Sequence, residues 1–119
     1  MKIYIASKTK HAASWLKLRE QRPDVQITST WINEAGEGQT ADYAELAQRC
    51  IDEVKQADFV LLYCASDEVL KGALVEVGVA LALGKDIRCV GDSFTLSRVF
   101  CRHPLWKWFT SIERALNAK

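Results

Sequence analysis

The stretch DFVLLYCASDEVLKGALVEVGVALALGK, residues 58–85, carries the pattern that decides the fold. Its opening run, DFVLLYCA, is almost continuously apolar, which is typical of a central parallel strand covered on both faces. A short polar loop follows, and then an apolar segment closes on Gly84-Lys85, a typical helix stop. Strand, loop and helix in this order predict one repeat of a parallel α/β sheet.

The same alternation extends in both directions along the chain. Further strands are expected at residues 2–7, 25–32 and 86–92, with a strand or turn at 106–109, and further helices at 11–21, about 41–57 and the C-terminal end. Right-handed crossovers then predict a three-layer α/β/α sandwich with a mostly parallel central sheet of four or five strands, flavodoxin- or Rossmann-like. We expect residues 1–119 to form one such domain, with ligands bound outside the carboxyl ends of the strands.

Composition and motif searches exclude several classes of protein. The net charge of +1 creates no field that would select a nucleic acid or a membrane surface. The four cysteines form no CxxC pair and the two histidines lie far apart, so we expect no metal site. No GxGxxG or P-loop pattern occurs, and we expect no cofactor. The apolar run after Met1 is too short for a signal peptide and no run could cross a bilayer, so we expect a cytoplasmic protein.

Glu76 is the only charged residue within residues 72–84. The segment is otherwise apolar on every side, so we expect the helix to be buried, and a buried carboxylate needs compensation. It falls about one turn from the helix start, where the dipole favours its ionised form. Its neighbours at i±3 and i±4 are all small: Gly72, Ala73, Val79 and Ala80. Glu76 is therefore either a solvated, dipole-stabilising residue or a group that faces a cavity.

Three segments resemble the nucleoside 2-deoxyribosyltransferase family, which includes 2′-deoxynucleoside 5′-monophosphate N-glycosidases: IYIAS, QADFVLLY and KGALVEVGVALALGK. The family motif is a glycine-containing loop, then Glu-x-Gly-x-Ala, then Gly-Lys, and it covers about residues 57–85 here. The resemblance implies cleavage or transfer of the N-glycosidic bond of a (deoxy)nucleoside or nucleoside 5′-monophosphate. It further implies a covalent intermediate in which the sugar is esterified to Glu76.

The resemblance also implies a substrate site around this glutamate. Gly72 would bring the backbone close to the sugar or phosphate, and Ser7 begins the substrate loop after the first strand. Lys8 and Lys10 would suit a 5′-phosphate, or they lie in a solvated loop. Trp31, after the second strand, would stack on the base or fill the core.

Two positions depart from the family pattern. Cys50 stands near the position where members often carry an aspartate, with Asp52 expected to point elsewhere, and Leu70 replaces an acidic residue or a serine. The acid that assists the leaving base is therefore unassigned. The candidates, each of which is otherwise a surface carboxylate, are Asp42, Glu37 and Asp67.

Two alternatives to a nucleoside glycosidase or transferase remain open. The first is a non-catalytic nucleotide-binding or sensing module of the same fold, and the more distant one is a TIR-type NAD-cleaving domain. The family resemblance implies a homo-oligomer, a dimer or larger, with a small nucleoside or nucleotide as partner and neither a nucleic acid polymer nor a membrane.

Overall fold

The structure, a computed structural model, describes residues 1–35, 40–91, 96 and 99–119. Its centre is a five-stranded sheet in the order β2-β1-β3-β4-β5, and every pairing is parallel. The strands are β1 (Lys2–Ala6), β2 (Gln26–Ile27), β3 (Phe59–Cys64), β4 (Asp86–Gly91) and β5 (Trp106–Phe109). This is the flavodoxin-like order, in which the direction of strand addition switches between β1 and β3. The expected α/β fold is confirmed.

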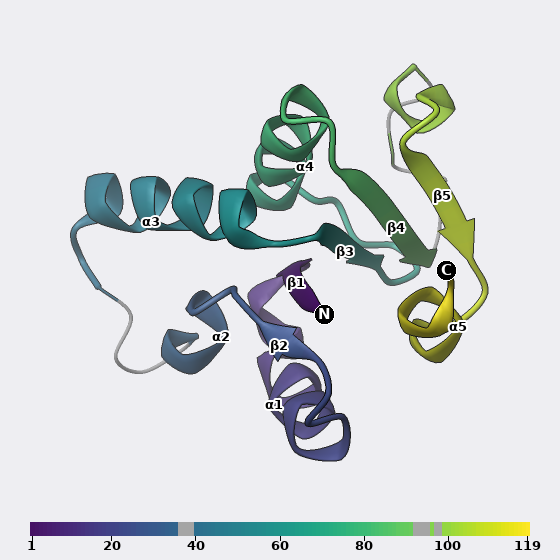
Figure 1. Ribbon diagram of the computed structural model, residues 1–119. Helices are drawn as coiled ribbons and strands as arrows, with labels where there is room; N and C mark the ends of the chain where they lie inside the picture. Colours follow the sequence, from purple (N-terminus) through teal and green to yellow (C-terminus); the bar gives the residue numbers. More distant parts are fainter. Residues whose placement is uncertain (36–39, 92–95, 97–98) are drawn as a thin grey trace.

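Helices cover both faces of the sheet (Figure 1). One face carries α3 (Tyr43–Gln56) and α4 (Gly72–Ala82), and the other carries α1 (Ala12–Gln21) and α5 (Ile112–Asn117). The remaining helical segments are short: η1 (Thr9–His11), α2 (Trp31–Glu34) and η2 (Phe100–Arg102). No helix in the described part of the chain is long and apolar enough to span a membrane.

The second strand is much shorter than the sequence predicts. Only Gln26–Ile27 pairs as β2, and the chain turns into α2 at Trp31. The reason lies in the hydroxyl side chain of Ser29. The Thr28 amide still donates to the Ile3 carbonyl at 2.7 Å, but the next amide of β1, that of Ile5, donates to Ser29 Oγ at 3.1 Å. Side chains of this kind offer the backbone an alternative to a ladder, so the strand ends early.

The helix α4 is not buried on every side, contrary to the sequence-based expectation. Ala73, Val77 and Ala80 are buried, but Val75 is 66% exposed. A helix in an outer layer always has a face directed away from the sheet, and here that face is apolar. The predicted stop is confirmed: Gly84 has φ +73°, and the Lys85 amide donates to the Ala80 carbonyl at 2.9 Å. This is a Schellman-type end, which favours glycine.

The C-terminal aromatic residues form strand β5, which resolves the strand-or-turn alternative. Trp106 is buried and Trp108 is 43% exposed. The ring centroids of these two tryptophans lie 5.8 Å apart. Trp106 therefore packs against the edge of the sheet, while Trp108 is only partly covered.

Candidate functional site

A cavity of about 450 Å³ lies at the carboxyl ends of β1 and β3, where the strand order switches. Four parts of the chain line it. They are the loop after β1 (Ser7, Lys8, Thr9), α2 (Trp31), α3 (Leu46, Ala47, Cys50, Ile51) and the start of α4 with the residues before it (Leu70, Lys71, Gly72, Ala73, Val75, Glu76, Val79). The volume is typical of pockets that hold small molecules. The lining is mainly apolar, with a few polar groups among it.

Glu76 stands in the second turn of α4 and is the only carboxylate among the described lining residues. The hydroxyl of Tyr4, in the middle of β1, donates a hydrogen bond to Glu76 Oε2. Tyr4 is fully buried, so the hydroxyl reaches the carboxylate from inside the fold. Three small neighbours of Glu76, namely Gly72, Ala73 and Val79, line the same cavity. The space expected beside the carboxylate is therefore present.

Burial raises the pKa of Glu76 to about 8. The hydrogen bond from Tyr4 acts in the opposite direction, because a donor stabilises the charged form of a carboxylate. Burial thus outweighs the helix dipole, which was expected to keep the group ionised. A carboxyl group with such a pKa exchanges its proton close to neutral pH, which is typical of groups that take part in catalysis.

The structure brings together some of the predicted site residues and separates others. Those that line the cavity with Glu76 are Ser7, Lys8, Trp31 and Gly72. Of these, Gly72 has open space around the position of a Cβ atom, so no part of the described chain approaches it closely. The residues that do not line the cavity are Lys10, Asp42 and Asp67.

The three described residues outside the cavity have contacts or conformations of their own. The ammonium group of Lys10 lies 3.3 Å from Glu68 Oε2. Asp42 caps α3, where its Oδ1 accepts from the Glu45 amide at 3.1 Å. Asp67 is exposed and has φ 68°, a conformation that aspartate tolerates in turns. Glu37 lies outside the described residues.

Cys50 and Leu70, the two departures from the family pattern, both line the cavity. Burial raises the pKa of the Cys50 thiol, and the negative charge of Glu53 adds to this effect. Asp52 points elsewhere, as expected, and its Oδ1 accepts from Gln48 Nε2 at 3.0 Å. At these two positions an apolar or weakly polar side chain therefore stands where the family pattern has an acid or, at Leu70, an acid or a serine.

Sequence reasoning missed Tyr4 and Lys71 as site residues. Lys71 precedes α4 and lines the cavity. Tyr4 was assigned to the core strand, where its ring does lie. The available signal was its hydroxyl, because a tyrosine in an otherwise aliphatic strand needs a hydrogen-bond partner when it is buried.

The loop after β1 is tied to the loop after β3. His11 Nε2 lies 2.7 Å from Glu68 Oε2, and the Ala65 amide donates to Glu68 Oε1 at 2.8 Å. Burial acts to raise the pKa of Glu68, but the hydrogen bonds from Ala65, His11 and Lys10 outweigh it and lower the pKa. These contacts of the Glu68 carboxylate hold together the two loops that lead into the cavity. Among the described residues, no group of three His, Cys, Asp or Glu side chains could hold a metal ion.

Comparisons with known proteins bear on the fold. No protein-family model matches the chain, and no curated protein matches it in sequence. The structure is similar to that of a 2-deoxyribosyltransferase from the psychrotolerant bacterium Bacillus psychrosaccharolyticus, with a TM-score of 0.75 at 17% identity over 100% of this chain and 93% of that chain. It is also similar to the CMP N-glycosidase BcmB of Clostridium botulinum, with a TM-score of 0.60 at 15% identity over 93% of this chain and 91% of that chain.

These likenesses establish the fold. The resemblance to nucleoside 2-deoxyribosyltransferases read from the sequence is thus confirmed at the level of the fold, and the similarity extends along the whole chain. In sheets with this strand order, ligands bind at the switch between the first and third strands, where this cavity lies.

The cavity offers three kinds of group to a ligand. The ring of Trp31 and the apolar side chains of α3 suit a flat heterocycle. Glu76 provides a carboxylate that can attack an electrophilic carbon or accept a hydrogen bond. Lys8 and Lys71 provide ammonium groups that suit an anion such as a phosphate.

Proposed function

We propose that this protein cleaves or transfers the N-glycosidic bond of a (deoxy)nucleoside or nucleoside 5′-monophosphate, with Glu76 as the nucleophile. The observation that carries the proposal is the partly buried carboxylate of Glu76, which is held by the Tyr4 hydroxyl and borders a cavity of about 450 Å³. The fold shared with a 2-deoxyribosyltransferase and an N-glycosidase supports the same class of reaction.

In this mechanism a carboxylate oxygen of Glu76 attacks C1′ of the sugar. The C1′–N bond breaks as the new C–O bond forms, and the bonding electrons leave with the base. Water or a second base then attacks C1′, which releases the carboxylate and gives hydrolysis or transfer. The Tyr4 hydroxyl bonds to Oε2 and orients the carboxyl group for the first step.

The walls of the cavity suggest how the substrate lies. The base would stack on Trp31 against the apolar residues of α3, with the sugar beside Glu76 and Gly72. A 5′-phosphate would lie near Lys8 and Lys71, at the loop that begins with Ser7. The sequence predicted Lys10 as a phosphate contact together with Lys8. Because Lys10 pairs with Glu68 outside the cavity, we assign the phosphate to Lys8 and Lys71 instead.

A second candidate function is nucleotide binding or sensing without turnover. The observation that favours it is the pair of cavity residues Cys50 and Leu70, which stand at positions where the family resemblance implies polar groups. Leu70 has no proton to donate, and the raised pKa of the Cys50 thiol makes it a weaker acid than the carboxyl group that the resemblance implies there. In this case Glu76 would accept hydrogen bonds from the sugar hydroxyls instead of attacking C1′.

We further propose that the chain is a homo-oligomer, a dimer or larger. The outer face of α4 and the loop before it expose apolar side chains: Val69, Val75 and Leu83. Such a surface is commonly covered by a partner. Light scattering of the purified protein measures the assembly. A cytoplasmic location and a single domain spanning residues 1–119 remain predictions.

Base release measured by chromatography tests the enzyme proposal. The wild type and Glu76→Ala are each incubated with deoxy- and ribonucleosides, their 5′-monophosphates and NAD, with and without an acceptor base. Release by the wild type alone supports the proposal, and dependence on the acceptor identifies a transferase. Thermal stabilisation by a nucleotide without any base release would support the binding module instead.

A further inference from the structure

The helix α2 is a single turn, Trp31–Glu34, and a single turn of helix is not stable in isolation. Its first residue, Trp31, is 7% exposed and lines the cavity. The indole Nε1 donates to the Ile5 carbonyl at 2.9 Å, which fixes one edge of the ring to β1. The position of the ring therefore depends on what holds the short helix in place.

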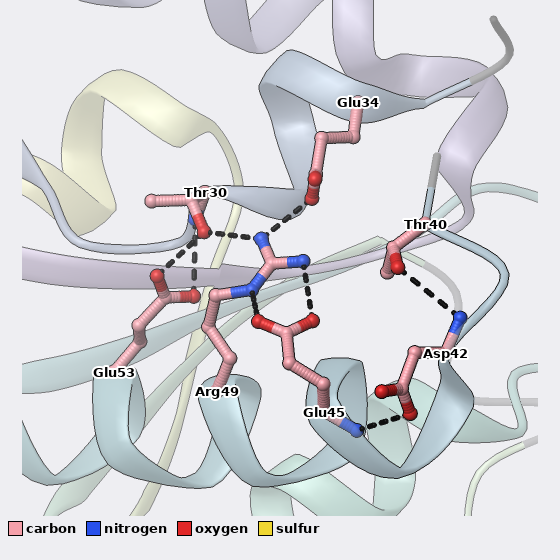
Figure 2. A network of polar contacts seen from close by, with 7 residues as sticks. All are labelled: Thr30, Glu34, Thr40, Asp42, Glu45, Arg49 and Glu53. Carbon is pink, nitrogen blue, oxygen red and sulfur yellow. Dashed lines mark hydrogen bonds and ion pairs between the residues drawn. The ribbon is translucent and has the colours of Figure 1, made fainter. Parts of the chain in front are cut away.

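The residue before Trp31 is held from α3 by a buried carboxylate. Glu53, which is 7% exposed, accepts two hydrogen bonds from Thr30. The Thr30 amide donates to Glu53 Oε1 at 3.1 Å, and its hydroxyl donates to Oε2 at 2.6 Å (Figure 2). Both donors of Thr30 that face α3 are thereby satisfied, so the start of α2 has one defined position.

The guanidinium group of Arg49, also on α3, forms hydrogen bonds at both ends of α2 (Figure 2). Its Nη1 donates to Thr30 Oγ1 at 2.8 Å and to Glu34 Oε2 at 2.5 Å. Its Nε and Nη2 donate to the two carboxylate oxygens of Glu45, at 2.9 and 3.2 Å. The two-point contact with Glu45 holds the plane of the guanidinium, with Nη1 directed toward α2.

A neighbouring face of α3 forms a wall of the cavity. Arg49 and Glu53 bond to Thr30 and Glu34 at α2, while Leu46, Ala47, Cys50 and Ile51 line the cavity. The helix α3 thus forms one wall of the cavity and also holds in place the short helix that carries Trp31, which forms another wall.

We infer that Arg49 is a positioning residue, which fixes Trp31 relative to α3 through its contacts with Thr30 and Glu34. It thereby sets the width of the slot that receives the base, meaning the part of the cavity between the Trp31 ring and the lining residues of α3. The inference rests on the proposed function for the identity of the ligand. The contact between Arg49 and α2 is independent of that function, so the two can be tested separately.

The test compares Arg49→Ala with Arg22→Ala. Arg22 is a matched control, since its side chain is 21% exposed against 23% for Arg49 and it also pairs with two carboxylates, Asp24 and Glu113. It joins the end of α1 to α5 on the other face of the sheet. Any general loss of stability from removing a paired arginine should appear in both variants.

The first readout does not depend on activity. In protein labelled with 5-fluorotryptophan, the Trp31 resonance is assigned with Trp31→Phe. We expect this resonance to shift or broaden in Arg49→Ala, while the other three tryptophans keep their wild-type signals. We expect Arg22→Ala to leave the Trp31 signal unchanged. A wild-type Trp31 signal in Arg49→Ala would overturn the inference.

The second readout is the preference among bases. We expect Arg49→Ala to raise KM for the preferred substrate about tenfold with little change in kcat, because the Tyr4–Glu76 contact is intact. We also expect the ratio of kcat/KM for purine and pyrimidine substrates to fall toward one. An unchanged ratio beside a shifted Trp31 resonance would overturn the claim about slot width. A wild type that cleaves no substrate would overturn the proposed function, and the resonance alone would then decide whether Arg49 positions Trp31.

A second pair of variants covers the case in which Arg49→Ala does not fold. Thr30→Val removes the hydroxyl that joins Arg49 to Glu53 and keeps the shape of the side chain. Thr30→Ser keeps the hydroxyl. We expect Thr30→Val to reproduce the Trp31 shift and the loss of preference, and Thr30→Ser to restore both. Equal behaviour of the two variants would contradict the inference.

Discussion

The hydroxyl of Tyr4 donates a hydrogen bond to Oε2 of Glu76, which joins the middle of β1 to the second turn of α4. Tyr4 is fully buried, while Glu76 borders the cavity. The contact stabilises the ionised carboxylate, and the apolar surroundings destabilise it. The balance between these two effects sets the pH range in which Glu76 can act.

Removing the hydroxyl should weaken catalysis and shift its pH dependence. In Tyr4→Phe we expect kcat to fall by about tenfold or more, because an oriented donor to the reacting group is lost. The pKa of Glu76 should rise further, so the ascending limb of the pH–rate profile should move to higher pH. Tyr63→Phe is the control, since Tyr63 packs against His11 and Trp15 away from the cavity. Equal profiles for Tyr4→Phe and the wild type would contradict the assigned role of the hydroxyl.

The wild-type rate should rise with pH through neutrality. A nucleophilic carboxylate must be ionised, and the pKa of Glu76 is raised to about 8. Below that value kcat/KM should increase by about tenfold per pH unit and then level off. Initial rates between pH 5.5 and 9.5 at constant ionic strength measure this. A rate that falls between pH 6 and 8 would instead indicate that the protonated form of Glu76 is the active one.

The same carboxyl group should make stability depend on pH. Its folded-state pKa of about 8 lies above the ordinary value of 4.5, so the folded state binds the extra proton between these values. The stabilisation is complete below about pH 4.5 and is lost as the pH rises through 8, by at most about 1.4 kcal/mol per pH unit. Urea unfolding at pH 5 to 8 should show this decline in the wild type. Glu76→Gln, which is always neutral, should lack it, and parallel curves for the two proteins would refute the raised pKa.

The two neighbouring lysines of the loop after β1 should differ in effect. Lys8 lines the cavity, whereas Lys10 pairs with Glu68 outside it. We expect Lys8→Ala to raise KM for a nucleoside 5′-monophosphate about tenfold and to leave KM for the matching nucleoside unchanged. Lys10→Ala should change neither constant by more than about twofold, since the Lys10 side chain is mostly exposed and Glu68 keeps its contacts with His11 and the Ala65 amide. A larger effect from Lys10→Ala would mean that the phosphate lies on the other side of the loop.

The fold could be predicted where the signal is local. The continuous apolar run of β3 and the glycine stop at Gly84 were readable because each depends on adjacent residues. The end of β2 was not, because it depends on the Ser29 hydroxyl accepting from the Ile5 amide of β1, about 25 residues away. A stretch that alternates well enough for a strand can still turn away when a hydroxyl takes the place of a ladder partner.

The site followed the same rule. Glu76 and its small neighbours were predicted from the helical period, which is a local property. Tyr4 was missed because its partner lies 72 residues away, and only the crossing of α4 over β1 brings them together. The sequence also could not choose among the lysines, because the path of the loops decides that Lys8 and Lys71 face the cavity and Lys10 does not.

The most direct test of the central claim is to look for the sugar on Glu76. The wild type is mixed with a substrate that it turns over, quenched in acid within milliseconds to seconds and digested, and the peptide that contains Glu76 is analysed by mass spectrometry. We predict a glycosyl ester on Glu76 that disappears once the substrate is used up or an acceptor base is added, and no base release by Glu76→Ala. Base release by the wild type without an adduct at any time point, together with base release retained in Glu76→Ala, would contradict the account.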